Sequence, residues 1–314
     1  MRVSASEGLV YPALMPAFIC TACGTQYPSS EAPPGACLIC TDERQFVPAS
    51  GQSWTTLEGL RNAHSNKFRR LATGLTTIET TPAFGIGQRA ILARTPAGNV
   101  LWECLALIDD ATVDLLKGLG GVAAIAISHP HYYTTMVEWS RALGGVPIYL
   151  HAADRQWVMR PDPAVQFWEG DTKPIGPGLS LVRLGGHFDG GTVLHWADWS
   201  EGRSVLLSGD ILQVVPSGHV SFMWSYPEPD PALRRQGSAH GGDSGAIRIR
   251  RGLRLVFGPG ADRRKRQADG RGLRRALHRP DQRDIVEPIC IALRIPADRE
   301  HDFQSIVSTR SSRW

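Results

Sequence analysis

The feature that most constrains the fold is a short apolar run followed closely by two histidines. Val122 to Ile127 contains only small or β-branched apolar residues, and His129-Pro130-His131 comes directly after Ser128. A run of this kind predicts a strand buried on both faces, as in a sheet covered by helices. Side chains two positions apart in an extended segment point the same way. The pair therefore indicates part of a metal site, and the alternative is two polar loop residues after a core strand.

Two later segments end in further residues that can bind metal. Segment 181–187 is predicted to be a strand that leads through two glycines to His187, and segment 204–210 an apolar strand that ends in Asp210. His-x-His, then His, then Asp, each after a strand, resembles the metallo-β-lactamase superfamily, and the resemblance extends from Ile78 to Pro227. It implies an α/β fold, the αββα sandwich, with a metal site along one edge of two packed sheets.

The central motif of that superfamily, His-x-His-x-Asp-His, is incomplete in this chain. Positions 129–134 read His-Pro-His-Tyr-Tyr-Thr, so Tyr133 stands where the motif has aspartate and Thr134 where it has the last histidine. In the family these two residues serve a second metal, so the resemblance implies a single-metal site here. Glu103 matches an earlier aspartate of the family, with a side chain one methylene longer.

The resemblance implies that one metal is held by His129, His131, His187 and Asp210. Three imidazole nitrogens and one carboxylate oxygen are a tetrahedral set that suits zinc. A bound zinc ion would bring the pKa of water near neutrality and polarise the scissile bond of a substrate. Asp210 would be the fourth ligand or orient the water, and Tyr133 is a second candidate catalytic residue because its hydroxyl could donate to an oxyanion.

Four cysteines near the start of the chain indicate a second metal site. Cys20, Cys23, Cys37 and Cys40 form two Cys-x-x-Cys knuckles. Two knuckles make a closed zinc site that needs little hydrophobic core, because metal binding supplies the folding free energy. The segment 18–47 resembles a rubredoxin-like zinc ribbon. Two disulfides are an alternative that a cytoplasmic chain disfavours, and iron in the same four-thiolate cage is another.

Four segments are expected along the chain. The ribbon occupies 18–47, a connector with a short helix 48–74, the metallo-β-lactamase-like domain 75–227, and a basic, low-order tail 228–314. Apolar spacing over 54–71 predicts the connector's helix, and segment 109–119 predicts another, with Asp110 as candidate N-cap. Segment 161–177 is expected to be an irregular loop.

The charge of the chain is unevenly distributed. Residues 1–227 carry 15 of the 34 Lys+Arg and 19 of the 30 Asp+Glu, so residues 228–314 carry a net charge of +8. Basic runs such as Arg263-Arg264-Lys265-Arg266 are typical of a solvated segment. The pattern breaks where the sandwich would be incomplete, so a second interpretation is translation out of frame. Nucleic-acid binding is not expected, because aromatic residues do not interleave with the basic ones.

Three functions are compatible with these features. The first is a single-zinc hydrolase acting on an unidentified small-molecule substrate. The second is a non-catalytic relative that binds a ligand or partner, with the ribbon as a protein-docking module. The third is a redox protein with iron in the four-cysteine site. No apolar run approaches the roughly 20 residues that span a bilayer, and the N-terminal residues do not resemble a secretory signal, so a cytoplasmic location without membrane contact is expected.

Overall fold

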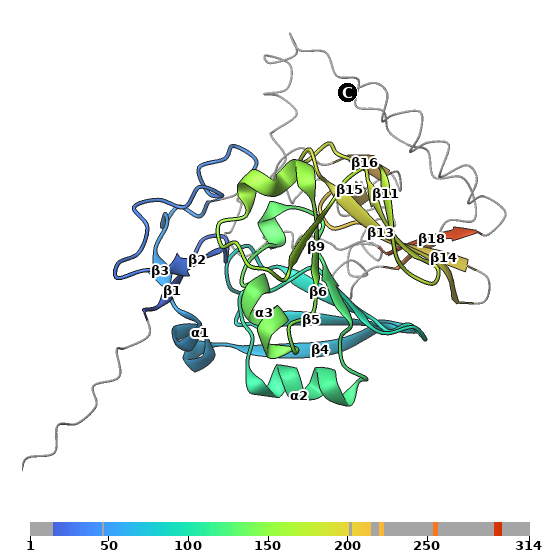
Figure 1. Ribbon diagram of the computed structural model, residues 1–314, viewed down its shortest axis with the longest axis horizontal. Helices are drawn as coiled ribbons and strands as arrows, with labels where there is room; N and C mark the ends of the chain where they lie inside the picture. The colour runs from blue at the N-terminus through green and yellow to red at the C-terminus, as the bar shows by residue number, and fades with distance from the viewer. Residues whose placement is uncertain are drawn as a thin grey trace, which may run out of the picture.

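The computed structural model describes residues 15–45, 47–200, 203–214, 220–222, 254–256 and 292–296. Two large sheets pack face to face, and a small three-stranded sheet lies beside them (Figure 1). The helices of the described residues are α1 Leu57–Ala63, α2 Asp110–Gly118 and α3 Met136–Ala142, with the 3₁₀ turns η1 Pro130–Tyr132 and η2 Ala152–Trp157. None of the helices in these ranges is long and apolar enough to cross a membrane.

The first large sheet has seven strands in the order β10-β9-β8-β7-β6-β5-β4. Strands β7, β8, β9 and β10 run parallel to one another. The pairs β4–β5, β5–β6 and β6–β7 are antiparallel. Their bounds are β4 Ser65–Ala72, β5 Leu75–Thr81, β6 Arg89–Ala93, β7 Val100–Trp102, β8 Ala124–Ala126, β9 Ile148–His151 and β10 Val165–Trp168.

The second large sheet has six strands in the order β11-β12-β13-β14-β18-β17, all antiparallel. Its strands are β11 Thr172–Gly176, β12 Leu179–Arg183, β13 Thr192–Ser200, β14 Arg203–Leu207, β17 Arg254–Val256 and β18 Ala292–Pro296. The small sheet contains β1 Ala17–Cys20, β2 Gln26–Ser29 and β3 Trp54–Thr55, and β15 Leu212–Val214 pairs with β16 Val220–Phe222.

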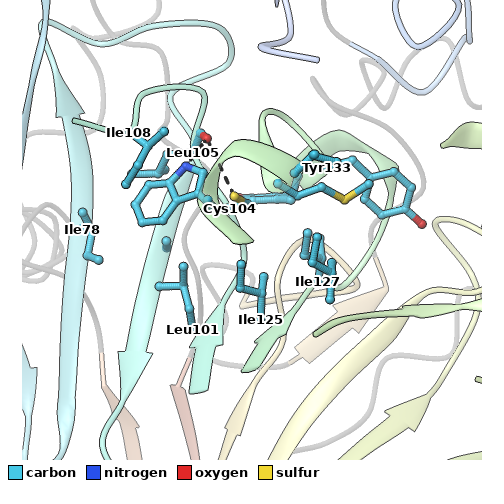
Figure 2. Packing of buried hydrophobic residues seen from close by; sticks show 14 of the residues in the cluster. Ile78, Leu101, Cys104, Leu105, Ile108, Ile125, Ile127 and Tyr133 are labelled. Carbon is cyan, nitrogen blue, oxygen red and sulfur yellow. Dashed lines mark hydrogen bonds between the residues drawn. The ribbon is translucent and has the colours of Figure 1, made fainter. Parts of the chain in front are cut away.

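Two apolar layers hold the sandwich together. One lies between the seven-stranded sheet and helices α2 and α3, and it includes Leu101, Ile108 and Ile125 (Figure 2). The other lies between the two sheets and includes Trp102 and Trp196. Strand β6 shows how both form, because Ala90 and Leu92 belong to the first layer and Ile91 and Ala93 to the second. This alternation is expected of a strand that is covered on both faces.

Several elements differ from the sequence-based expectations. The helix expected over 54–71 is only α1, which ends at Ala63, and β4 then supplies an edge strand of the seven-stranded sheet. In β4, Asn66 and Phe68 are less exposed than their neighbours, so the period is two and not 3.6. The N-cap of α2 is Asp109, not Asp110, because the Asp109 carboxylate accepts from the Thr112 amide at 2.7 Å.

The loop expected over 161–177 contains two strands, β10 and β11. The low-order tail expected over 228–314 contains two strands as well, and β18 pairs with the whole length of β14. A partner strand in the sandwich satisfies backbone groups that the local sequence pattern could not reveal. The rest of this tail lies outside the described residues, so its order and the out-of-frame interpretation stay predictions.

Candidate metal centres

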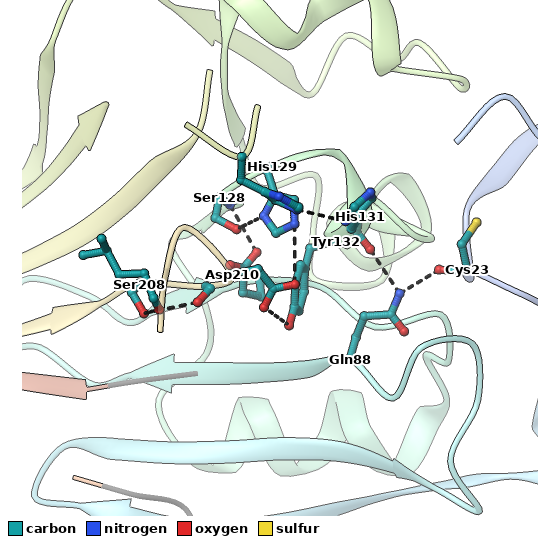
Figure 3. Close-up of polar contacts among 12 residues, drawn as sticks. Cys23, Gln88, Ser128, His129, His131, Tyr132, Ser208 and Asp210 are labelled. Atoms are coloured by element: carbon teal, nitrogen blue, oxygen red, sulfur yellow. Dashed lines mark hydrogen bonds and ion pairs between the residues drawn. The ribbon is translucent and has the colours of Figure 1, made fainter. Parts of the chain in front are cut away.

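Three loops bring together the four side chains that were expected to bind metal. His129 and His131 follow β8, His187 follows β12, and Asp210 follows β14. One potential ligand atom from each lies within 4.8 Å of the others. Nε2 of His187 is 3.2 Å from Nδ1 of His131, and Nε2 of His129 is 3.7 Å from Oδ2 of Asp210 (Figure 3). We call this group the histidine centre.

The two neighbouring histidines reach the centre through a turn and not through an extended segment. His129 has extended backbone, and the 3₁₀ turn η1 begins immediately after it at Pro130. Proline suits the first position of a helical turn because its φ is preset and it has no N–H that needs a partner. The two imidazole rings then meet edge to face, with 5.0 Å between their centroids.

The donor set of the histidine centre fits a single cation. All four side chains are buried, and Nε2 of His129 and Nε2 of His131 lack a hydrogen-bond partner among the described residues. Burial is the main cause that lowers the pKa of both histidines, so their imidazoles are neutral and have lone pairs to offer. A buried nitrogen without a partner is costly, and coordination would satisfy Nε2 of His129, while His131 faces His187 through its Nδ1.

A buried relay orients one of these histidines. Oε2 of Glu103 accepts from the Ser128 amide at 3.1 Å, and the Ser128 hydroxyl is 2.6 Å from Nδ1 of His129. This contact engages Nδ1 and leaves Nε2 to face Asp210. Glu103 has φ of 67°, a left-handed conformation that residues other than glycine rarely adopt and that often occurs at functional sites. Its side chain therefore orients the histidine loop despite the extra methylene.

Of the two tyrosines in the motif, Tyr132 is the one at the histidine centre. Its hydroxyl is 3.5 Å from Oδ1 of Asp210, and its ring centroid is 5.3 Å from that of His129. Tyr133 packs in the apolar layer beside α3 together with Cys104, a buried thiol that acts there as a small apolar residue (Figure 2). The catalytic role expected of Tyr133 stays a prediction. Alignment with the motif could not reveal that η1 turns Tyr132 toward the centre.

The four cysteines also converge, and we call them the cysteine centre. Their sulfurs lie within 4.8 Å of one another, with 3.7 Å between Cys20 and Cys40 and 3.6 Å between Cys23 and Cys37. A disulfide would require about 2.05 Å, and all four are free thiols. Metal–sulfur bonds of about 2.3 Å in a tetrahedron place sulfurs about 3.8 Å apart. The geometry therefore fits one four-thiolate metal ion, and zinc and iron are both compatible with it.

Asp154 supports the loop that carries His187, and the raised pKa of its carboxyl predicts that the stability of the fold depends on pH. Its Oδ1 accepts from the Gly190 amide at 2.8 Å, and burial is the main cause that raises its pKa from 3.8 to about 7. Between about pH 4 and 7 the carboxyl of Asp154 is therefore protonated in the folded state and ionised in the unfolded chain. The contribution of this group to stability is fully present below pH 4 and is lost as pH rises through about 7.

We expect Asp154→Asn to flatten the pH dependence of stability. The free energy of unfolding of the wild type should fall relative to this variant between pH 4 and 8, by at most about 4 kcal/mol. Urea unfolding at several pH values measures the difference. Asp162→Asn is a suitable control, because Asp162 is far less buried and the pKa of its carboxyl is lowered. Parallel profiles for wild type and Asp154→Asn would contradict the prediction.

The architecture and the histidine centre define this chain as a protein of the metallo-β-lactamase fold. Helices cover one face of a sheet, that sheet packs on a second one, and the ligands follow strands of both sheets at one edge. The N-terminal four-cysteine unit precedes this sandwich. No family model matches the sequence.

A curated relative shows the family. The chain is 48% identical over 225 residues to the uncharacterized protein YmaE of Bacillus subtilis (strain 168). The matched region covers 70% of this chain and 82% of YmaE. The chain therefore belongs to the same family as YmaE.

Similar solved structures include two metallo-enzymes. A subclass B3 metallo-beta-lactamase from a soil metagenome library is 18% identical, with a TM-score of 0.33, over 42% of this chain and 58% of that one. An N-acyl homoserine lactone hydrolase, with its product bound at the catalytic metal centre, is 18% identical, with a TM-score of 0.32, over 43% and 65%. The chain thus spans less than two thirds of either structure.

Proposed function

We propose that this protein is a metal-dependent hydrolase with one metal ion in the histidine centre and a small-molecule substrate. The observation that carries the proposal is the convergence of four buried side chains, in which Nδ1 of His131 lies 3.2 Å from Nε2 of His187 and Nε2 of His129 lies 3.7 Å from Oδ2 of Asp210. A zinc ion held there would supply an activated water and polarise the scissile bond.

The residues of the chain would prepare this site in two ways. Glu103 and Ser128 hold the ring of His129 in one orientation, which fixes the direction of its Nε2 lone pair. Tyr132 places a hydroxyl beside Oδ1 of Asp210. Burial raises the pKa of Asp210 to about 7, and a bound cation would favour the ionised form of this carboxyl, which is the form that coordinates.

One observation favours a different function, that of a non-catalytic binding module. The four ligand side chains are at most 5% exposed. A surface pocket of about 310 Å³ lies nearby, between the cysteine centre and η2, and its lining includes Asp42 and Trp157. A substrate would have to approach the histidines from such an opening, whereas a structural metal would need none. The activity test below separates these two functions.

The test is metal-dependent turnover by the full chain. Zinc-loaded protein is assayed with a lactone, a β-lactam, a thioester and a phosphodiester, and the same panel is repeated with His187→Ala. We expect at least one substrate to be hydrolysed and the variant to be slower by about 10³-fold, which corresponds to about 4 kcal/mol of lost transition-state stabilisation. Loaded wild type that hydrolyses none of the four, or a variant as active as wild type, would contradict the hydrolase.

A further inference from the structure

The cysteine centre lies against the histidine centre, and each of its two knuckles contacts a different ligand loop. The first knuckle, Cys20 to Cys23, is linked to the loop of His131, and the second, Cys37 to Cys40, is linked to the loop of His187. A module that only recruits a partner would not need contacts of this kind. These contacts place the small sheet against the loops that carry the histidine ligands.

The link from the first knuckle passes through Gln88, a buried residue just before β6. Its amide nitrogen donates to the carbonyl of Cys23 at 2.6 Å and to the carbonyl of His131 at 3.1 Å (Figure 3). Beside this bridge, the amide of Gln26 donates to the carbonyl of Thr134 at 3.0 Å. The first knuckle and the β2 strand that follows it are therefore joined to the histidine loop by hydrogen bonds within η1 and just after it.

Close packing accompanies these hydrogen bonds. Gly24 has φ of +82°, and a Cβ there would lie 3.2 Å from the Cβ of Ala106 and 3.4 Å from a methyl carbon of Thr134. Glycine suits this left-handed conformation, and a side chain at position 24 would crowd Ala106 and Thr134. Opening of the knuckle would therefore remove support from the loop directly.

The link from the second knuckle passes through Arg44. Its guanidinium pairs with Asp42 through two contacts of 2.7 Å, and NH1 donates to the carbonyl of His187 at 3.1 Å. The guanidinium also lies 3.9 Å from the ring centroid of Phe188. Phe188 in turn contacts the rings of the three histidines, with centroids 5.0 to 5.6 Å away.

Backbone contacts hold the residues between the second knuckle and Arg44 in place. The Thr41 amide donates to the carbonyl of Cys37 at 3.1 Å, and the Asp42 amide faces the carbonyl of Ile39 at 3.4 Å. Asp42 therefore follows the metal-binding turn directly, and its carboxylate fixes the planar fork of Arg44 in one position. The apolar core of the ribbon also packs against Trp157 and Met159, in and just after η2.

From this geometry we infer that the metal-loaded cysteine centre positions the ligands of the histidine centre, with Gln88 and Arg44 as the two positioning residues. The inference rests on the proposed function insofar as it assumes that the histidine centre binds a metal. Each link ends on the backbone carbonyl of a ligand residue, so loss of a link would leave all metal ligands in the chain. What would change is the rigidity of the loops that carry His131 and His187, and hence the affinity for the ion.

The test is the zinc affinity of each centre in the full chain, measured by competition with a chromophoric chelator. The variants are Gln88→Ala and Arg44→Ala, and the matched controls are Gln166→Ala and Arg155→Ala. Gln166 is exposed on β10, and Arg155 stacks on Phe167 in the same manner as Arg44 stacks on Phe188, without contact to a ligand loop. Arg44→Lys, which keeps a cationic donor, is the conservative variant.

We expect Gln88→Ala and Arg44→Ala each to weaken zinc binding at the histidine centre by about 10- to 100-fold, as for other groups that orient metal ligands. Binding at the cysteine centre should change less than threefold, because the four thiolates are intact, and Arg44→Lys should recover part of the loss. General destabilisation would instead weaken both centres. Cobalt substitution assigns each ion, since thiolate coordination adds a charge-transfer absorption that imidazole coordination lacks.

Two outcomes contradict this inference in different ways. If wild type binds two ions and the affinity of the histidine centre is the same in Gln88→Ala, Arg44→Ala and the controls, the two centres are independent while the proposed function stands. If wild type binds a single ion, with cobalt spectra of thiolate coordination only, the proposed function fails and this inference fails with it.

Discussion

His131→Ala is expected to reduce the bound metal from two ions per chain to one. His131 supplies one of three imidazoles in the histidine centre, and its Nδ1 lies 3.2 Å from Nε2 of His187. Removal of one ligand from a four-ligand set leaves a site that water must complete, and the variant side chain offers no donor. Elemental analysis of purified protein after dialysis against a weak chelator measures the change, and hydrolysis should fall with it.

His64→Ala is the matched control for this measurement. His64 ends α1, and its Nδ1 is 2.9 Å from the carbonyl of Pro82, so it takes no part in either centre. The control should retain two ions. One ion in wild type and in both variants would mean that only the cysteine centre is loaded, and the single-zinc hydrolase would be ruled out. Two ions in His131→Ala would show that the ligand assignment is wrong.

Cys37→Ser is expected to release the ion of the cysteine centre and to unfold the segment around it. The sulfur of Cys37 lies 3.6 Å from that of Cys23, and the small sheet has few apolar residues besides the cysteines themselves. Structural zinc contributes about 10 to 16 kcal/mol of apparent binding free energy in small domains that depend on it. Loss of even part of this should make residues 18–47 accessible to protease.

The measurement is limited proteolysis with mass spectrometry, combined with elemental analysis. Cys104→Ala is the control, since it removes a buried thiol outside the cysteine centre and should leave cleavage and metal content near those of wild type. Because the knuckles contact the ligand loops, Cys37→Ser should also lower occupancy of the histidine centre. A variant that keeps two ions and resists protease would contradict the four-thiolate site.

Patterns that depend on neighbouring residues were predictable from the sequence. The apolar run before His129 is β8, and the Cys-x-x-Cys spacing brings four sulfurs together. Such signals survive in any compact fold, because the period of a strand and the reach of a tight turn depend on local backbone geometry. The order of the histidines and Asp210 resembles that of the metallo-β-lactamase superfamily, and this resemblance was the basis for expecting one site from three loops.

Features that depend on distant partners were not predictable in this way. The apolar spacing in segment 65–72 is that of a helix, but the segment is strand β4 because it pairs with β5. In the same way, β18 is a strand because it pairs with β14. Strand pairing satisfies backbone groups across long separations in sequence, so a local pattern carries no record of it.

The contents of the histidine centre show the same division. Its ligands could be named from strand ends, but a single 3₁₀ turn sets which tyrosine faces Asp210, and the contacts of Gln88 and Arg44 join segments that are far apart in the chain. Ligand identity is a matter of side-chain chemistry, which the sequence states directly. Orientation depends on how loops from different sheets pack against the ribbon, and those contacts exist only once the chain has folded.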